Sequence, residues 1–249
     1  MLSAHFVHMS GHSHAKTVMA TKMANDAKKG KIYSKYGRLI TIAVKEGGGS
    51  GDPEKNSKLK TIIEQAKNMN MPKDNIDRAI KKGTGELASE ALVSVSYEGF
   101  GPGGIALIIN GITDNTNRTL GEIKTTLNQN NGKMAGEGAV RWMFDAKGVI
   151  AILLENKEKE ELELAAIEAG AEDVKWQEDI LEVYTKPEEL EATKKTLEDK
   201  GLKIDSTSID LVPKEEVELS EKDKEQTQRL FEALDENDAV NDIYSNIKN

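Results

Sequence analysis

The feature that most constrains the fold is a division of charge between two parts of the chain. Residues 11–85 hold 16 Lys and Arg against 7 Asp and Glu, a balance of +9. Residues 86–249 hold 18 against 36, a balance of −18. A basic segment on an otherwise acidic chain is typical of a separate domain that binds a polyanion. The alternative is a solvated helical surface that happens to be rich in lysine.

Composition narrows the class of protein. A chain of 249 residues allows one large domain or two to three small ones. The absence of cysteine excludes disulfides, thiolate chemistry and cysteine-based zinc sites, and it suits a reducing compartment. No apolar run approaches the roughly 18 residues of a membrane span, and no secretory signal is apparent. We therefore expect a cytoplasmic protein without a membrane association.

The basic segment predicts a three-helix domain over residues 20–86, behind a flexible tail over 1–19. Residues 24–45 show the apolar spacing of one long helix. After the glycine-rich break at 47–51, Asp52 is placed to cap the second helix, with Pro53 at its first position. The third helix is expected to start at Met71-Pro72 and to end at Gly83. The expected core comprises Ile32, Tyr36, Leu39, Ile40, Ala43, Leu59, Ile62, Ile63, Ala66, Ile76, Ala79 and Ile80.

Cations gather on the side of these helices opposite the apolar positions. On the first helix they fall within an arc of about 100° with no acid among them, whereas a solvated face normally interleaves glutamate. The third helix directs further cations outward. Few base-reading amides accompany them, and Tyr33 and Tyr36 lie toward the apolar face, so we expect phosphate contact without sequence reading or base stacking. The predicted nucleic-acid site comprises Lys28, Lys29, Lys31, Lys35, Arg38, Lys45, Arg78, Lys81 and Lys82.

The acidic part begins with a predicted sheet. Strands at Val93–Tyr97 and 105–109 flank a glycine-rich loop over 99–104. Phosphate-binding loops run from strand to helix, and this loop runs from strand to strand, so it predicts a hairpin turn. A helix to about Gln129 follows, with Asp114 or Thr113 as its cap. Alternation of Val140, Trp142 and Phe144 predicts a third strand, after a glycine-punctuated loop over 130–138.

The corner before that helix is a candidate polar contact site. It is made of Asn115, Asn117 and Arg118. Pure helix capping explains the same residues equally well, and the sequence leaves both explanations open.

Residues 148–209 show the order βαββαβ of a ferredoxin-like domain. A helix over 220–234 and a strand over 240–247 follow, and the strand can return to the sheet begun at Val93. We therefore expect an α+β fold with a small N-terminal helical bundle and two α/β-sandwich-like domains. The ferredoxin-like domain is inserted in a discontinuous domain over 87–147 and 210–249.

Catalytic patterns are weak in this sequence. All four histidines lie in the first 14 residues, where His12-Ser13-His14 is better explained as a mobile tail than as a metal site. No nucleophile-elbow motif appears, and the carboxylates recur at solvated helix spacings. We expect no enzyme, no cofactor and no metal. The alternatives are a phosphate- or nucleotide-handling enzyme that uses the 99–104 loop with Asp114 and Arg118, and an acidic protein-interaction scaffold.

Several motifs in order resemble the YebC/PmpR family, which includes the mitochondrial translational activator of cytochrome c oxidase subunit I. They are Gly11-His12-Ser13, Asp26-Ala27-Lys28-Lys29-Gly30-Lys31, Gly48-Gly49, Asp52-Pro53, Asn70-Met71-Pro72-Lys73-Asp74-Asn75-Ile76, Ala79-Ile80-Lys81-Lys82-Gly83-Thr84-Gly85, Tyr97-Glu98-Gly99, Gly101-Pro102-Gly103-Gly104, Thr113-Asp114-Asn115 and Asn117-Arg118-Thr119.

This resemblance implies a three-domain, non-enzymatic regulator of gene expression in the cytoplasm or, in eukaryotes, the mitochondrion. It implies either a DNA-binding transcriptional regulator or a ribosome-associated translation factor, so DNA and ribosomal RNA are both open as partners. The chain departs from the family pattern after Ser13. Ala15, Met19, Ala20 and Thr21 stand where many members have a tryptophan and a basic run. The glycine loop is also longer, at Ser50-Gly51.

Overall fold

The structure is a computed structural model that describes residues 26–88, 91–155 and 157–248, with side chains from Lys29 onward. Two compact units are present. The first contains the described residues of Met1–Phe144 together with those of Pro213–Asn249, and the second is Asp145–Val212. The predicted tail over 1–19, with its histidines, lies outside the described residues. The division into three domains at the predicted boundaries stays a prediction.

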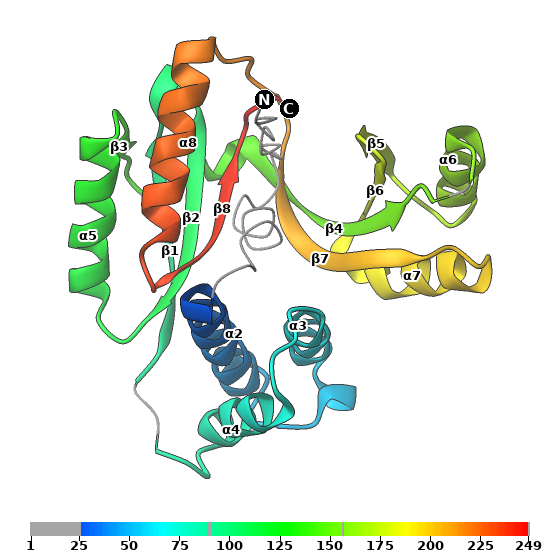
Figure 1. The fold of residues 1–249 in the computed structure, drawn as a ribbon, viewed down its shortest axis with the longest axis horizontal. Coiled ribbons are helices and arrows are strands. Elements are labelled where there is room, and N and C mark those ends of the chain that lie inside the picture. The colour runs from blue at the N-terminus through cyan, green and yellow to red at the C-terminus, as the bar shows by residue number, and fades with distance from the viewer. Residues whose placement is uncertain (1–25, 89–90, 156, 249) are drawn as a thin grey trace. The chain divides into compact units, whose positions relative to one another are not determined.

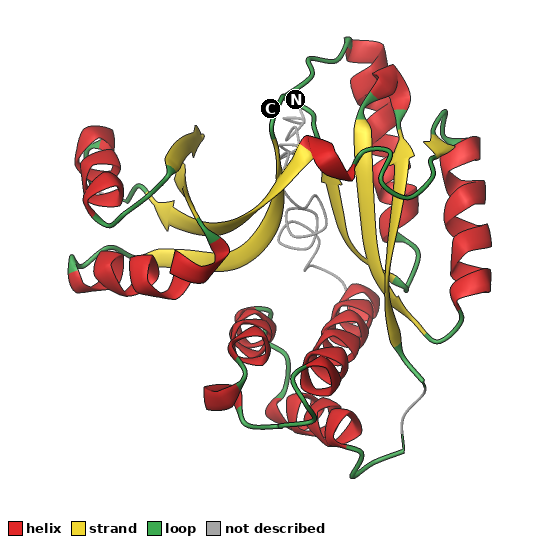
Figure 2. Ribbon diagram, turned by 180° about the vertical axis from the view of Figure 1, so that it is seen from behind, coloured by secondary structure: helices red, strands yellow, loops and turns green. Residues whose placement is uncertain are grey.

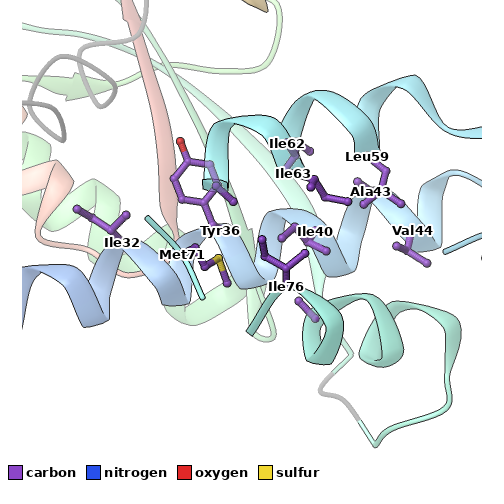
Figure 3. Close-up of a cluster of buried hydrophobic side chains, with 12 residues drawn as sticks. Ile32, Tyr36, Ile40, Ala43, Val44, Leu59, Ile62, Ile63, Met71 and Ile76 are labelled. Carbon is purple, nitrogen blue, oxygen red and sulfur yellow. The ribbon is translucent and has the colours of Figure 1, made fainter. Parts of the chain in front are cut away.

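Three helices open the first unit: α2 (Asp26–Glu46), α3 (Ser57–Asn68) and α4 (Lys73–Thr84). Helices α2 and α4 run in the same direction. The Tyr33 hydroxyl donates to the Asn70 carbonyl and the Thr41 hydroxyl donates to the Ala79 carbonyl, so contacts advance along both segments together. Their apolar faces meet in one cluster (Figure 3). The cluster holds Ile32, Tyr36, Ile40, Ala43, Val44, Leu59, Ile62, Ile63, Ala66, Met71, Ile76 and Ala79, with Leu39 and Ile80 half-buried beside it.

The start of α3 differs from the prediction. Asp52 caps only a short 3₁₀ turn, Pro53–Lys55, through a bond from the Glu54 amide. The α-helix begins after Asn56, whose Oδ1 accepts from the Leu59 amide at 3.0 Å. The Asn56 side chain also donates to the Ala43 carbonyl at 2.8 Å, so this cap ties α3 to α2 as well.

The end of α4 also differs from the prediction. Gly83 lies inside the helix, and the left-handed cap is Gly85, with φ of 87°. A Cβ atom on Gly83 would lie 2.6 Å from Cβ of Val44. Glycine is therefore needed at position 83 for the close approach of α4 to α2, and not for a turn.

A four-stranded sheet and two helices that pack on it form the rest of the first unit (Figure 1). The order of the sheet is β3 (Lys133–Met134), β1 (Val93–Phe100), β2 (Ala106–Thr113) and β8 (Val240–Ser245), and neighbouring strands are antiparallel. The helices α5 (Thr116–Gln129) and α8 (Glu221–Asp235) share a core with these strands. The return of the last strand to the sheet begun at Val93 is thereby confirmed. The 99–104 segment is a turn between β1 and β2 with a 3₁₀ turn at Pro102–Gly104, also as predicted.

Two further predictions in this unit were wrong. Residues Arg141–Met143 form a 3₁₀ turn, and the next strand starts only at Phe144. The cap of α5 is Asn115, whose Oδ1 accepts from the Arg118 amide at 3.0 Å. The Thr113 hydroxyl accepts from the Asn115 amide, which positions the capping residue.

The second sheet carries the βαββαβ order (Figure 2). Its elements are β4 (Phe144–Leu153), α6 (Lys159–Glu168), β5 (Asp173–Gln177), β6 (Ile180–Thr185), α7 (Leu190–Asp199) and β7 (Ile204–Pro213), with a 3₁₀ turn at Pro187–Glu189. The strand order β5-β6-β4-β7 is that of a ferredoxin-like sheet. The unit has a core of its own around Ile150, Leu162 and Leu197. The α+β fold class is as predicted. No helix among the described residues is long and apolar enough to cross a membrane.

Candidate nucleic-acid interface

The predicted cations within one arc of α2, which we call the α2 stripe, are Lys28, Lys31, Lys35, Arg38 and Lys45. The structure places Lys35, in the middle of this stripe, in a buried ion pair. Its side chain is 2% exposed, and Nζ lies 2.8 Å from Oδ1 of Asp235 and 3.1 Å from the Asp235 carbonyl oxygen. Burial lowers the pKa of Lys35 below its usual value, and the Asp235 carboxylate counteracts part of that effect. In this structure the ammonium group is enclosed by the protein and out of reach of a phosphate.

Two more stripe residues contact the same end of α8. Lys31 Nζ lies 3.2 Å from Oε2 of Glu236, and Arg38 Nη1 donates to the Asp238 carbonyl at 2.8 Å. The C-terminal end of a helix carries partial negative charge and free carbonyl groups, which attract cations. Lys31, Lys35 and Arg38 therefore bind the end of α8 and the turn before β8.

An apolar residue on the same side of α2 explains why this face is packed. Ile42 lies four residues after Arg38 and seven after Lys35, and it is 5% exposed. Residues at these spacings share one helix face. Sequence reasoning treated that face as wholly cationic and passed over Ile42, which was the available signal that the face is covered by protein.

The other predicted cations of α2 are placed differently. The side chain of Lys28 lies outside the described part of the chain. Lys29 is half-buried, and Lys45 is exposed in the last turn of α2. Both Lys29 and Lys45 take part in polar or electrostatic interactions within the protein.

Helix α4 presents the most accessible cations of the predicted set. Arg78, Lys81 and Lys82 are exposed on it. Within the described residues, none of the three forms an ion pair with a carboxylate. Asp74 and Asp77 are exposed near the start of the helix, so positive charge is concentrated in its last two turns. Cations in these turns also interact favourably with the negative C-terminal end of the helix dipole, which is a stabilising structural role.

The parallel packing of α2 and α4 brings Lys45 to the same end of the bundle as these cations. Val44 of α2 lies against Gly83 of α4. Lys45 follows Val44 in the chain and Lys82 precedes Gly83, so both lysines flank this contact. The structure therefore gathers Lys45, Arg78, Lys81 and Lys82 at one end, which we call the α4 basic end. Lys31, Lys35 and Arg38 lie nearer the start of α2, where they contact the end of α8 and the turn after it.

The polar corner is largely a capping structure. Asn115 caps α5, and Arg118 pairs with Asp114 at 2.7 Å and with Glu122 at 3.9 Å. Asn117 and Arg118 also line a shallow hollow of about 600 Å³ between α5 and the end of α8. Because two carboxylates share the charge of Arg118, this hollow has little attraction for an anion. Its lining is completed by Gly121, Glu122, Thr125, Thr126, Ala233 and Asn237.

Sequence reasoning missed a buried carboxylate. Glu98 is 8% exposed and accepts from the amides of Gly138 at 2.7 Å, Val140 at 2.6 Å and Arg141 at 3.0 Å. Burial by itself raises the pKa of Glu98, but the three backbone bonds outweigh burial and hold the pKa below its usual value. The carboxylate fixes the loop before β4. The sequence signal was a charged residue in a strand, followed much later by a glycine-punctuated loop rich in free amides.

The glycine-rich turn offers no phosphate cradle. It joins two antiparallel strands, and no helix N-terminus opens from it. Gly103 and Gly104 adopt positive φ values of 69° and 78°, as a tight turn requires. Across the described ranges, no group of three or more His, Cys, Asp or Glu residues is arranged to hold a metal ion.

Comparison with known proteins gives one consistent result. Residues 13–86 match a model described as the N-terminal domain of TACO1/YebC proteins, and residues 92–247 match one described as the second and third domain. A probable transcriptional regulatory protein of Dehalococcoides mccartyi is 42% identical over 238 residues, covering 96% of this chain and 94% of the relative. One of Geobacter sulfurreducens is 44% identical, with 96% and 95% covered.

The fold has a solved counterpart. The crystal structure of a conserved hypothetical protein from Aquifex aeolicus aligns with a TM-score of 0.82 at 40% identity. The alignment covers 92% of this chain and 93% of that one.

Proposed function

We propose that this chain, which belongs to the TACO1/YebC family, regulates gene expression by binding nucleic acid at the α4 basic end. The observation that carries the proposal is the exposure of Arg78, Lys81 and Lys82 without a carboxylate partner in the described chain. The similarity to proteins named as probable transcriptional regulators supports a role in transcription, with DNA as the polymer.

The contact is electrostatic. Phosphate contacts by lysine and arginine supply affinity and release counterions, but they carry no sequence information. The proposed interface is Lys45, Arg78, Lys81 and Lys82, with Lys28 and Lys29 as predicted members nearer the start of α2. Lys31, Lys35 and Arg38 are left out, because in the structure they bind the end of α8. The acidic remainder of the chain carries a net negative charge, so electrostatic attraction for the polymer is concentrated at this end.

A ribosome-associated role in translation is the second candidate. It is favoured by the side chains of the last two turns of α4, which supply charge but no Asn or Gln for reading base edges. A surface of this kind suits a large structured RNA as well as it suits duplex DNA. In either role we propose that the protein acts without catalysis and in the cytoplasm. An acidic interaction scaffold is the remaining alternative.

A charge-matched pair of variants tests the proposal. Arg78→Ala/Lys81→Ala/Lys82→Ala removes three positive charges from α4. The control, Lys195→Ala/Lys222→Ala/Arg229→Ala, removes three exposed cations from α7 and α8. Fluorescence anisotropy with labelled duplex DNA and with structured RNA is expected to show a loss of affinity of about tenfold or more for the α4 variant. The control should bind almost as the natural chain does.

Equal losses of affinity for the two variants would show that binding depends only on the net charge of the protein. No loss of affinity in either variant would refute the proposed interface. A pull-down from lysate with and without RNase separates the two roles. Retention of promoter DNA after RNase favours transcription, whereas loss of the bound material favours the ribosome.

A further inference from the structure

Trp142 is the most exposed large apolar side chain of the described residues. It is 67% exposed and sits in the 3₁₀ turn Arg141–Met143 of the first unit. Leaving an indole ring of this size in water forgoes the stabilisation that its burial would bring. Val140 and Phe144, two positions before and after Trp142, are buried, with exposed fractions of 0% and 3%. The indole ring of Trp142 therefore projects into solvent from a backbone segment that buried side chains anchor.

The support beneath Trp142 is rigid. The carboxylate of Glu98 binds the amides of Val140 and Arg141, which immediately precede the ring. The indole Nε1 donates to the Ala139 carbonyl at 3.0 Å, which fixes the orientation of the ring. On the far side, the Lys214 amide donates to the Met143 carbonyl at 2.9 Å. A side chain held from both sides loses little conformational entropy when it binds a partner.

The chain on either side of the ring offers small residues and one exposed cation. Gly136, Gly138 and Ala139 precede it and leave its neighbourhood open to a flat ligand. Arg141 is exposed and donates one guanidinium bond, from Nη1 to the Phe144 carbonyl, which leaves other donors of the group for a ligand. Residues 130–145 carry two cations and two carboxylates, so this segment is neutral in a region whose overall balance is strongly negative.

We infer that Trp142 is a stacking platform for an unpaired nucleobase, with Arg141 beside it for the adjoining phosphate. The inference rests on the proposed nucleic-acid binding and adds a second contact, of a different kind, to the α4 basic end. An aromatic ring stacks on any base because every base has a π-face, and arginine adds attraction for the backbone. The site prefers single-stranded segments, whose bases are free to leave the stack.

The surface fits a nucleobase better than a protein partner. Aromatic anchors at protein interfaces sit in well-packed apolar pockets and are surrounded by further contacts that exclude water. Of residues 136–145, the exposed ones beside Trp142 are two glycines, an alanine, one cation and two carboxylates, with no second large apolar side chain among them. A flat, isolated ring with a cation next to it matches the combination of stacking and charge found in single-strand binders.

The chain contains two tryptophans, so the fluorescence of Trp142 can be isolated in the full-length protein. Trp176→Phe removes the other indole and keeps an aromatic face for Lys159, which lies 4.5 Å from that ring. In this background we titrate a single-stranded oligonucleotide, the same strand with abasic sites in place of the bases, and a duplex. Stacking predicts strong quenching with the base-bearing strand and little with the abasic strand.

Affinity measurements give an independent readout. Trp142→Ala is expected to weaken binding of the base-bearing strand about 5- to 100-fold, the range for loss of one base stack, and to leave the abasic strand almost unaffected. Equal losses for both strands, or no loss for either, would overturn the stacking role. If a lysate protein instead bound the natural chain and not Trp142→Ala, with no quenching by oligonucleotide, the ring would be a protein contact and the inference wrong. Failure of every nucleic acid to bind the natural chain would refute the proposed function itself.

Discussion

Two buried charged side chains, Glu98 and Lys35, depend on hydrogen bonds that offset the cost of their burial. Glu98 accepts three backbone amides, and Lys35 is enclosed by the carboxylate and carbonyl of Asp235. An unpaired charge at either site would be costly, because the desolvation of the group would no longer be offset. Single residues of this kind determine where loops and helices dock.

Glu98→Gln tests the loop anchor. The amide offers one oxygen to three donors and turns its own NH₂ toward them, so we expect a loss of about 1–3 kcal/mol in the free energy of unfolding at pH 7. The folded pKa of Glu98 lies below the unfolded value of about 4.3. Its contribution is therefore complete above that pH and disappears as the pH falls through the folded pKa.

Urea unfolding of the natural chain and the variant at pH 7 and at pH 3 checks the sign. The difference between the two proteins should shrink as the pH is lowered through the folded pKa of Glu98, because protonation then removes the charge from Glu98 in the natural chain. A difference that stays constant over this range would show that the charge of Glu98 has no part in holding the loop.

Gly83→Ala tests the contact of α4 with α2. The added Cβ would lie 2.6 Å from Cβ of Val44 and 2.9 Å from the Thr41 carbonyl oxygen, so the helices must move apart. We expect a destabilisation of about 1–3 kcal/mol from overpacking. The control is Gly37→Ala in α2, where a Cβ meets nothing within 4 Å, and helix propensity predicts a gain of up to about 1 kcal/mol. Thermal unfolding distinguishes them, and stabilisation by both would refute the close packing.

At the scale of elements, the docking of α2 on the end of α8 is the contact that changes the interpretation of the sequence. A long-range ion pair joins residues 200 positions apart. Lys35→Ala leaves the Asp235 carboxylate largely buried without its partner, so we expect a loss of about 3–5 kcal/mol.

A double-mutant cycle with Asp235→Ala measures the coupling of the pair. The double variant should be less destabilised than the sum of the single ones, because neither charge is then left alone. The pair Lys31–Glu236, with side chains 23% and 75% exposed, is the matched control and should couple by less than about 1 kcal/mol. Additive effects of Lys35→Ala and Asp235→Ala in chemical unfolding would contradict a functional ion pair.

Much of the element pattern could be predicted from the sequence because it depends on local periodicity. Helical spacing gave the faces of α2, α3 and α4, and alternation with turn residues gave the βαββαβ order. The errors at Gly83 and around Trp142 arise from contact between segments distant in sequence, whereas the caps of α3 and α5 were each misplaced by a few residues along the chain. Gly83 was interpreted as a cap when it is a packing residue, and the region of Trp142 was interpreted as a strand because its apolar residues alternate.

The candidate site was predictable only in part for the same reason. Outward cations can be recognised from one helix alone, which sufficed for Arg78, Lys81 and Lys82. Whether another element covers a cationic face depends on the tertiary fold. The helix pattern therefore predicts Lys35 as a phosphate ligand, whereas the structure buries it against Asp235.

At the scale of the whole molecule, the division of charge has two consequences. Part of the positive charge binds the acidic remainder and joins the helical bundle to the end of α8. Another part, at the α4 basic end, is exposed and is the part that the proposed function uses. A salt titration separates these two uses, because only exposed contacts with phosphate release counterions on binding.

The most direct test is therefore the salt dependence of nucleic-acid affinity, measured for the natural chain, for Arg78→Ala/Lys81→Ala/Lys82→Ala, and for Lys31→Ala/Arg38→Ala. We predict that the slope of log K against log salt becomes shallower by about 2 to 3 in the α4 variant, as expected for three lost phosphate contacts. The α2 variant should keep the slope of the natural chain. An unchanged slope in the α4 variant together with a shallower slope in the α2 variant would contradict the account.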